Sequence, residues 1–375
     1  MTVLLVGEDP GGIDVIVPIK RRLDALGEAA PVVCSGPGRP VWQRHGIAFE
    51  DITDRVADPV NAEAVRTLIA AHRPNILVTS TSFPRKMEKV FRREAKALGI
   101  PTVMVLDADR SDLYRPEPEE LACRPDLALS IGGRMTTQLE AAGYAKVVTT
   151  GHLAFADIVG AGAVLSADDV AVWRRDVLRA DPSRELVVVF SDNISQVFGE
   201  DGAIAEIGYH ERIAVPDLLR AIAAIAKADG RRFDVVVKLH PKEDRGAFDA
   251  VFAELSGPEI VFREIAATDN IRLILAADHI VGMYSIIMVW SALLGRTTLS
   301  YQPDARKDTL LVTAHDGAVP LCTKRTELDG MVRSFLADPI WRARWQTVLA
   351  GWQPPLDGLD RAISAISALA QGVDR

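Results

Sequence analysis

The sequence has few cysteines and no long apolar run, and each shortage argues against a class of protein. Its three cysteines, Cys34, Cys123 and Cys322, are too widely spaced for a metal-ligand motif or a disulfide framework. A reducing cytosol is the simplest interpretation of that spacing. No apolar stretch approaches the roughly 20 residues that span a bilayer, and residues 2–6 have the pattern of a strand rather than of a signal peptide. We therefore expect a cytoplasmic protein without a transmembrane segment, for which peripheral membrane contact stays open.

Several motifs that mark catalytic or cofactor sites are also missing. The sequence contains no G-x-x-x-x-G-K-[ST] phosphate loop, no G-x-S-x-G nucleophile elbow and no H-E-x-x-H pair. The glycines that follow the first apolar run lack the G-x-G-x-x-G spacing of a dinucleotide site. We therefore expect no bound metal and no cofactor. The net charge of −8 argues against non-specific adhesion to nucleic acid.

The length and the order of the elements predict more than one α/β domain. A chain of 375 residues is too long for one ordinary core, and its 48% hydrophobic and 25% charged residues are typical of globular proteins. Short apolar runs alternate with helical patterns in the first half, which is typical of a parallel sheet. The expected strands are 3–7, 31–34, 47–49, 76–79, 102–106, 127–130 and 147–149, and the expected helices are 13–26, 62–72, 85–98 and 135–142.

A second series of the same kind begins after a helix, a linker and a helix over residues 152–184. Its expected strands are 186–190, 235–239, 259–262, 280–283 and 298–301, and its expected helices are 216–228, 245–255, 271–276 and 286–294. The pattern predicts an α/β fold with two doubly wound, Rossmann-like domains that face each other across a cleft. We expect domains at 1–180 and 181–340, followed by helices over 341–375 that pack back on the first domain.

Polar residues at two predicted strand ends of the second domain are candidates for a phosphate site. Ligands of such sheets bind outside the carboxyl ends of the strands, where the run Val-Val-Val-Lys-Leu-His-Pro places Lys238, His240 and Pro241. An imidazole N–H can donate to a phosphate oxygen, although a histidine that only caps the strand is the alternative. Ser285 follows another strand and begins a helix, where an N-cap serine is common for structural reasons alone. Lys238 is either a phosphate contact or a solvated strand residue.

Other strand ends supply carboxylates and small residues. The loop Gly-Glu-Asp-Pro-Gly-Gly over 7–12 lets the backbone approach a ligand at a helix N-terminus, or is simply a tight turn. Its candidate side chains are Glu8 and Asp9, with Gly11 and Gly12 as the close-approach positions. A carboxylate at a strand end, such as Asp107, can serve as a general base, although surface aspartates are common in loops. Further candidates follow the first strand of the second domain: Ser191, Asn193 and, in a predicted loop over 200–202, Asp201.

Four segments resemble the GT-B glycosyltransferase superfamily. They are GEDPGG at 7–12, TTGHLAFAD at 149–157, VVVKLHPKED at 235–244 and the long segment at 277–303. A His-Pro pair followed by a serine motif looks most like bacterial sialyltransferases, Kdo transferases and CDP-glycerol glycerophosphotransferases. The second segment is similar to the one that closes the first domain in the 2-epimerase and glycerophosphotransferase branches. Sialyltransferases also carry an acid-acid-glycine motif, and its likeness to residues 200–202 implies that Asp201 is a base.

Two departures from the patterns of these branches leave the identity of the nucleotide undecided. Cytidine-using branches often have two hydroxyl residues in the serine motif, whereas Ile286 follows Ser285 here. UDP-using branches usually place a glutamate in the next helix to hold the ribose, and Trp290 stands at that position. The second departure weakens a UDP assignment, and both leave room for a donor outside the usual set or for a protein with lost activity.

The resemblance implies a metal-independent glycosyltransferase of bacterial glycoconjugate or surface-polysaccharide assembly. It implies that the second domain binds a nucleotide sugar, preferably a CMP-linked acidic sugar, with His240, Pro241, Ser285, Lys238, Ser191 and Asn193 near the nucleotide phosphate. It implies that the first domain binds a carbohydrate acceptor through Glu8, Gly11 and Gly12, and that Asp201, Asp9 or Asp107 deprotonates the acceptor hydroxyl. The alternatives are a UDP-sugar 2-epimerase-like enzyme and a non-catalytic binding module of the same fold.

Overall fold

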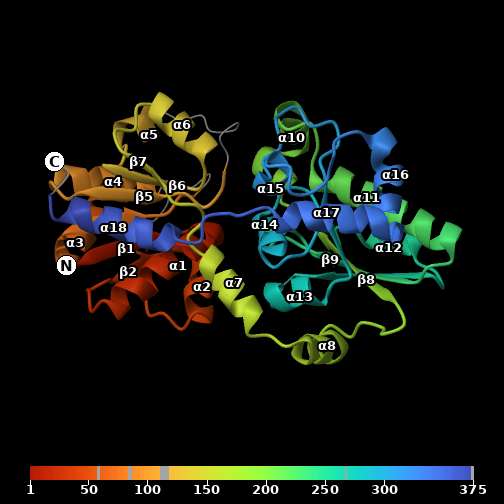
Figure 1. Cartoon of the computed structure of the whole chain (residues 1–375). Coiled ribbons are helices and arrows are strands. Elements are labelled where there is room, and N and C mark those ends of the chain that lie inside the picture. Colours follow the sequence, from red (N-terminus) through yellow and green to blue (C-terminus); the bar gives the residue numbers. More distant parts are fainter. Residues whose placement is uncertain (57–59, 83–86, 110–117, 267, 373–375) are drawn as a thin grey trace. The chain divides into compact units, whose positions relative to one another are not determined.

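The computed structural model describes residues 1–56, 60–82, 87–109, 118–266 and 268–372. Contacts divide the chain into two compact units: unit 1 comprises Met1–Asp157 and Pro354–Arg375, and unit 2 comprises Ile158–Gln353. Each unit contains one parallel β-sheet with helices packed on it (Figure 1). No helix in the described part of the chain is long and apolar enough to cross a membrane.

Unit 1 is built on a seven-stranded sheet with the order β3-β2-β1-β4-β5-β6-β7, and every pair is parallel. Its strands are β1 Val3–Gly7, β2 Val32–Cys34, β3 Glu50–Asp51, β4 Ile76–Thr79, β5 Thr102–Val105, β6 Leu127–Ser130 and β7 Val147–Thr149. Its helices include α1 Pro10–Ala25, α2 Arg39–Arg44, α3 Ala62–His72, α4 Met87–Ala97, α5 Pro118–Ala122, α6 Gly133–Ala141 and α18 Gly358–Ala370.

The strand β1 shows why this sheet is covered on both faces. All five of its residues are buried, and successive side chains of a strand point to opposite faces. Val3 and Leu5 pack in one core with α1 and α18, whereas Leu4 and Val6 pack in another with α3 and α4. A strand buried on both faces reads as a continuous apolar run, which is the pattern that β1 shows. The helix α18 comes from the end of the chain and lies beside α1 (Figure 1).

Unit 2 is built on a six-stranded parallel sheet with the order β10-β9-β8-β11-β12-β13. Its strands are β8 Glu185–Phe190, β9 Phe233–Lys238, β10 Ile260–Ile265, β11 His279–Gly282, β12 Thr298–Tyr301 and β13 Leu321–Cys322. Its helices include α8 Ala167–Asp176, α9 Ile194–Phe198, α10 Glu200–Glu206, α11 Glu211–Asp229, α12 Asp249–Leu255, α13 Asn270–Ala276, α14 Ile286–Leu293, α15 Val312–His315, α16 Leu328–Ala337 and α17 Pro339–Ala350. The remaining helix, α7 Phe155–Ala163, spans the division between the units.

The division between the units lies at residue 157, earlier than the 180 expected from the sequence. The reason is that α8 packs against α13 of unit 2, and Arg174 on α8 pairs with Asp278 at 2.9 Å. The helices over 341–375 also divide differently from the expectation. The helix α17 packs against α16 in unit 2, whereas α18 packs in unit 1, where Arg361 donates to the Thr149 carbonyl at 2.7 Å.

Most predicted strands have the observed bounds to within two residues, and the main differences are local. The strand expected at 47–49 is found at Glu50–Asp51, and β13 was not expected. Residues 200–202 were predicted as a loop, but they form the first turn of α10, because Gly199 with a φ of 72° lets α10 begin directly after α9. The helix predicted over 85–98 begins at Met87 in the structure, and residues 85–86 lie outside the described part.

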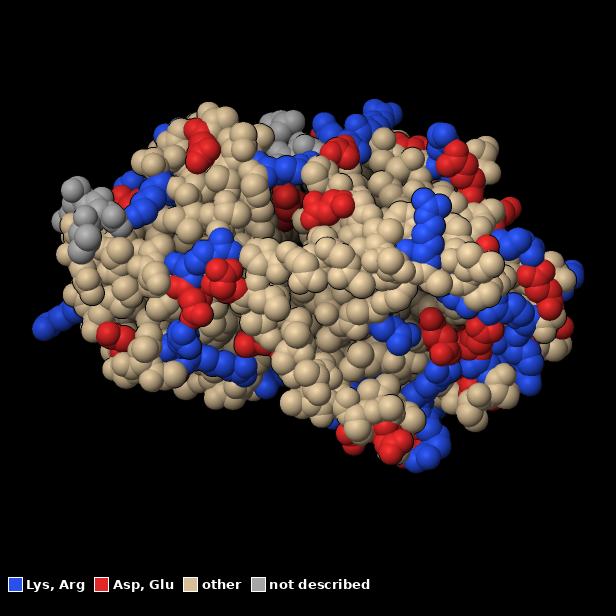
Figure 2. Space-filling model, in the orientation of Figure 1, with Lys and Arg blue, Asp and Glu red and all other residues tan. Residues whose placement is uncertain are grey.

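Charged side chains of both signs are mixed on the surface. Figure 2 shows Lys and Arg intermixed with Asp and Glu across the face in view. That face therefore has no broad basic patch of the kind that supports non-specific nucleic-acid binding.

Candidate functional site

The candidate residues of unit 2 meet at the carboxyl edge of its sheet. The strand β8 lies between β9 and β11, so the chain segments that follow these three strands are neighbours. Ser191 follows β8, His240 follows β9 and Ser285 follows β11. Neighbouring strands are about 4.8 Å apart, so His240 and Ser285 stand on either side of the segment after β8. The structure thus brings the two predicted phosphate contacts to one edge, one strand apart.

Glu243 ties two of these segments together. Its carboxylate accepts a hydrogen bond from the Ser191 hydroxyl at 2.8 Å and from the backbone N–H of His240 at 2.6 Å. The segment after β11 is attached to the same place, because the backbone N–H of Tyr284 donates to the Asp192 carboxylate at 3.2 Å. The three strand ends are therefore linked through two acidic side chains that were not among the predicted site residues.

Burial shifts the pKa values of two charged side chains at this edge, Glu243 and Lys238. It raises the pKa of Glu243 to about 7, against the hydrogen bonds from His240 and Ser191, and the nearby Glu211 and Asp192 raise it further. Burial also lowers the pKa of Lys238 to about 8, while the charge of Glu243 opposes this. Both side chains therefore change protonation near neutral pH.

Lys238 is not the solvated strand residue that one interpretation expected. It is 7% exposed, and its ammonium group donates to the Leu239 carbonyl at 2.7 Å. The alternation of side chains along a strand does not place it in solvent because both faces of this central strand are covered by helices. The positive charge of the Lys238 ammonium group is therefore buried beside the chain segments that follow the strands.

The ring of His240 has a defined orientation. Its Nδ1 accepts a hydrogen bond from the backbone N–H of Lys242 at 3.2 Å, so the neutral ring carries its proton on Nε2. Ser285 is the N-cap residue of α14, yet its hydroxyl makes no capping hydrogen bond. The Nε2–H of His240 and the Ser285 hydroxyl are thus the groups at this edge that suit an anionic ligand.

The loop after β1 forms the carboxyl edge of unit 1. A side chain at Gly11 would place its Cβ 2.7 Å from the Asp107 carboxylate, and one at Gly12 would lie 2.6 Å from the Ser80 hydroxyl. Asp107 follows β5 and accepts a hydrogen bond from the Thr81 hydroxyl at 3.1 Å. The glycines are therefore required for close packing of this loop on the segments after β4 and β5. Asp107 is half-buried, which leaves part of its carboxylate accessible.

Glu88 is the buried counterpart of Glu243 in unit 1. It lies on the first turn of α4 and is 2% exposed. It accepts hydrogen bonds from the Ser80 hydroxyl at 3.2 Å, from the backbone N–H of Glu8 at 3.2 Å and from the Ser82 hydroxyl. Burial nevertheless raises its pKa to about 7, and the charge of Glu8 adds to the effect. Each unit therefore holds a glutamate, buried in unit 1 and half-buried in unit 2, that accepts from a strand-end N–H and a serine hydroxyl.

The remaining predicted residues lie near these edges or away from them. Glu8 is buried and accepts from the Ser35 hydroxyl at 3.0 Å, and Asp9 is the N-cap residue of α1. Asn193 is the N-cap residue of α9, and Pro241 is exposed in the turn after β9. Asp201 is exposed on α10 and takes no part in the contacts described above.

Glu243 and Glu88 had different signals in the sequence. Glu243 stands three residues after His240, a spacing that lets a carboxylate reach back to a backbone N–H as in a capping box. That signal was present in the segment His-Pro-Lys-Glu. Glu88 resembles any acid in the first turn of a helix, and only the fold places it beside Ser80 and the loop after β1. Trp290 on α14 has a buried indole N–H that makes no hydrogen bond within the described structure.

The similarity of the chain to known proteins is structural. No family model and no curated protein sequence matches it. UDP-GlcNAc 2-epimerase from Neisseria meningitidis, solved with bound UDP-GlcNAc, is similar with a TM-score of 0.71 and 14% identity over 98% of this chain and 99% of that one. The S. aureus MnaA–UDP structure is similar with a TM-score of 0.71 and 12% identity, covering 99% and 97% of the two chains.

A third similar structure has the same architecture. MurG from Acinetobacter baumannii is similar with a TM-score of 0.59 and 11% identity, and the match covers 98% of this chain and 99% of MurG. The chain has a GT-B fold. The similar structures confirm the predicted α/β class and the predicted GT-B fold. The resemblance to the His-Pro branches within the superfamily stays a prediction.

Proposed function

We propose that the chain is an enzyme that acts on a sugar linked to a nucleoside diphosphate, and that it inverts C2 of a UDP-N-acetylhexosamine. The observation that carries the proposal is the match to UDP-GlcNAc 2-epimerases over nearly the full length of both chains, with UDP-GlcNAc named as bound in one of them. These matches support the epimerase alternative at least as well as they support sugar transfer. They give no particular support to a CMP-linked donor.

In this proposal the carboxyl edge of unit 2 binds the diphosphate. The Ser285 hydroxyl and the free N–H groups of the first turn of α14 donate to one phosphate. The Nε2–H of His240 donates to the other, and the buried ammonium of Lys238 offsets part of the negative charge. These groups are fixed by the sheet, so they also stabilise charge that develops on the diphosphate when its bond to the sugar weakens.

Inversion of a carbon centre also needs a proton acceptor and donor. The C2–H bond must break and re-form on the opposite face, so one group takes a proton and another returns one. Asp107 and Asp9 are half-buried carboxylates at the edge of unit 1, and we assign the proton transfers to them. Asp201 is a less suitable base because it is exposed on α10. Glu88 is too deeply buried to contact a substrate and acts by holding the loop that carries Asp9.

Sugar transfer to a hydroxyl acceptor is the second candidate. It is favoured by Trp290, because the resemblance implies a ribose-binding glutamate at this position in UDP-using branches, and by the structural similarity to MurG. In that case Asp107 or Asp9 deprotonates the acceptor, and the donor is a UDP- or CMP-linked sugar.

Thermal unfolding with a panel of nucleotides tests the nucleotide site. A ligand that binds only the folded chain raises the midpoint, and the stabilisation grows with the logarithm of its concentration relative to Kd. We expect UDP to stabilise the chain more than CMP, CDP, GDP or dTDP. A larger shift with CMP would favour the transferase candidate with a cytidine donor. A response to none of the five nucleotides would contradict both and leave the non-catalytic module.

A further inference from the structure

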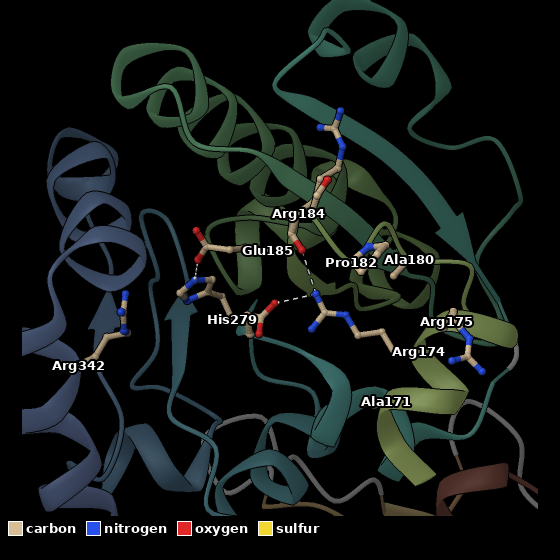
Figure 3. Close-up of a pocket in the computed structure, with 11 residues that line it drawn as sticks. Ala171, Arg174, Arg175, Ala180, Pro182, Arg184, Glu185, His279 and Arg342 are labelled. Carbon is tan, nitrogen blue, oxygen red and sulfur yellow. Dashed lines mark hydrogen bonds and ion pairs between the residues drawn. The ribbon is translucent and has the colours of Figure 1, made fainter. Parts of the chain in front are cut away.

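A cavity opens at the opposite, amino edge of the unit 2 sheet. Its volume is about 660 Å³, and it is lined by the first residues of β8 and β11, by α8 and by Arg342 of α17 (Figure 3). The strand β8 has six residues, so roughly 17 Å separates its amino end from the strand-end segments after Phe190. The cavity is therefore distinct from the proposed nucleotide site, and all of its lining residues belong to unit 2.

The lining is rich in arginine although the chain as a whole is acidic. Four arginines, Arg174, Arg175, Arg184 and Arg342, line the cavity together with two carboxylates, Glu185 and Asp278. Burial lowers the pKa of the adjacent His279, against the opposing effect of Glu185, so that its ring is neutral at pH 7. The lining therefore has an excess of positive charge in a chain of net charge −8.

Both carboxylates of the lining are already engaged. Glu185 accepts from His279 at 2.8 Å and pairs with Arg231, and these bonds lower its pKa to about 2. Asp278 pairs with Arg174 at 2.9 Å and accepts from the backbone N–H of Leu186 at 2.7 Å. Neither carboxylate has a hydrogen bond to Arg342.

Arg342 is bonded to no carboxylate in the described part of the chain. Its guanidinium donates only to the carbonyls of Phe335, at 3.2 Å, and Leu336 at the end of α16. Both bonds come from one terminal nitrogen, so the remaining N–H groups have no protein acceptor. Arg175 is held only by its neighbour Asp176, in an exposed pair that contributes little to stability. Arg342 is thus available to an anion, and Arg175 can be drawn from an exposed pair with Asp176.

The geometry points to a phosphorylated sugar as the ligand of this cavity, with its phosphate on Arg342. The planar guanidinium matches a phosphate bidentately, and several arginines favour a dianion over a monocarboxylate. The volume lies in the range of small-molecule sites and exceeds what phosphate alone fills. The other walls are small or polar, including Ser183, Ala171 and Ala180, and offer polar partners to hydroxyl groups, while the lining contains no Phe, Tyr or Trp for a nucleobase to stack on.

Calorimetric titration of the full chain with glucose 6-phosphate tests this site, with inorganic phosphate and glucose as separate arms. We expect glucose 6-phosphate to bind, inorganic phosphate to bind more weakly and glucose alone not to bind. Arg342→Gln should weaken glucose 6-phosphate binding by about tenfold or more, the scale of losing a charge-assisted hydrogen bond. The control is Arg344→Gln, which removes an exposed arginine of the same helix outside the cavity and should leave binding unchanged.

Further arms separate loss of the site from loss of the fold. Arg175→Gln removes a guanidinium whose only partner is exposed, so it should keep the wild-type unfolding midpoint and still weaken binding. UDP binding should be the same in all three variants because the nucleotide site is at the other edge. The inference is overturned if wild type shows no heat up to about 10 mM glucose 6-phosphate. It is also overturned if Arg342→Gln and Arg175→Gln both bind as tightly as wild type.

Discussion

At the scale of single residues, the orientation of His240 gives the sharpest test of the nucleotide site. Its Nδ1 holds the loop by accepting a hydrogen bond from the backbone N–H of Lys242, whereas its Nε2–H is the proposed donor to a phosphate. An asparagine at this position retains an acceptor near Nδ1 but has no donor at Nε2, and a glutamine extends an N–H donor toward the place of Nε2. The two variants therefore separate the structural role of the ring from its role as a donor.

We predict that His240→Asn lowers turnover of the nucleotide sugar by about 10²-fold, the scale of losing one oxyanion-type donor, while keeping the wild-type unfolding midpoint. His240→Gln should retain more activity than His240→Asn. Steady-state rates and thermal unfolding of both variants provide the measurement. Equal activity of wild type and His240→Asn would remove His240 from the site.

The buried carboxylate of Glu88 predicts a pH dependence of stability. Its pKa is raised to about 7 in the folded chain from an unfolded value of 4.5, so between these values the folded state binds more protons. The free energy of unfolding therefore falls as pH rises from about 4.5 to 7, by on the order of 3 kcal/mol from this group. In Glu88→Gln the contribution disappears, and the variant should gain stability relative to wild type between pH 5 and pH 8.

Chemical denaturation of wild type and Glu88→Gln across this pH range measures the difference. The matched control is Glu206→Gln, an exposed glutamate of α10, which should change the curve by a small constant at most. A difference between Glu88→Gln and wild type that stays constant from pH 5 to pH 8 would show that Glu88 titrates normally.

At the scale of elements, two helical glycines with opposite surroundings test the packing of the loop after β1. A Cβ at Gly12 in α1 would lie 2.6 Å from the Ser80 hydroxyl and 2.8 Å from the Thr81 carbonyl. Gly160 in α7 has open space around the same position and an exposed backbone. We predict that Gly12→Ala destabilises the chain by about 1–3 kcal/mol through overpacking.

Gly160→Ala should instead stabilise α7 by about 0.5–1 kcal/mol, because alanine restricts the unfolded chain and favours the helix. Denaturant midpoints of the two variants give both values. If Gly12→Ala is as stable as wild type, the loop is not held against the segments after β4 and β5.

Sequence patterns predicted the central elements well because burial on both faces leaves a continuous apolar run. The fully buried strands β1, β4, β6 and β12 were predicted with their observed bounds, and so was the half-buried edge strand β7. The two-residue strands β3 and β13 were not: β3 contains only Glu50 and Asp51, and its two polar residues carry no apolar pattern. The helix α10 was not predicted because its first three residues, two acids and a glycine, have the composition of a turn.

The candidate site was predicted only in part for a related reason. His240 and Ser285 follow strands that are recognisable from the sequence, so their common edge could be inferred from the rule for parallel sheets. Glu243 and Glu88 act instead through hydrogen bonds to segments that are distant in the sequence or belong to another element. No local pattern shows that the Ser80 hydroxyl reaches Glu88, or that burial brings the pKa of both glutamates to about 7.

At the scale of the whole molecule, the GT-B fold does not by itself select one function. The similar structures include enzymes named as epimerases and MurG, all at 11–14% identity. The distinction between epimerisation and transfer therefore depends on the fate of the sugar. Epimerisation exchanges the C2 proton with solvent and needs no acceptor, whereas transfer requires an acceptor and leaves the C2–H bond intact.

Proton NMR of UDP-N-acetylglucosamine incubated with the chain in D₂O measures that fate directly. The epimerase proposal predicts that the C2 proton signal of the sugar decreases as deuterium replaces that proton. It also predicts that signals of the C2 epimer appear at the same time. His240→Asn should slow both changes together. An unchanged sugar spectrum, from a chain that UDP stabilises against unfolding, would contradict epimerisation and favour transfer, and an unchanged spectrum without UDP binding would contradict the nucleotide-sugar assignment itself.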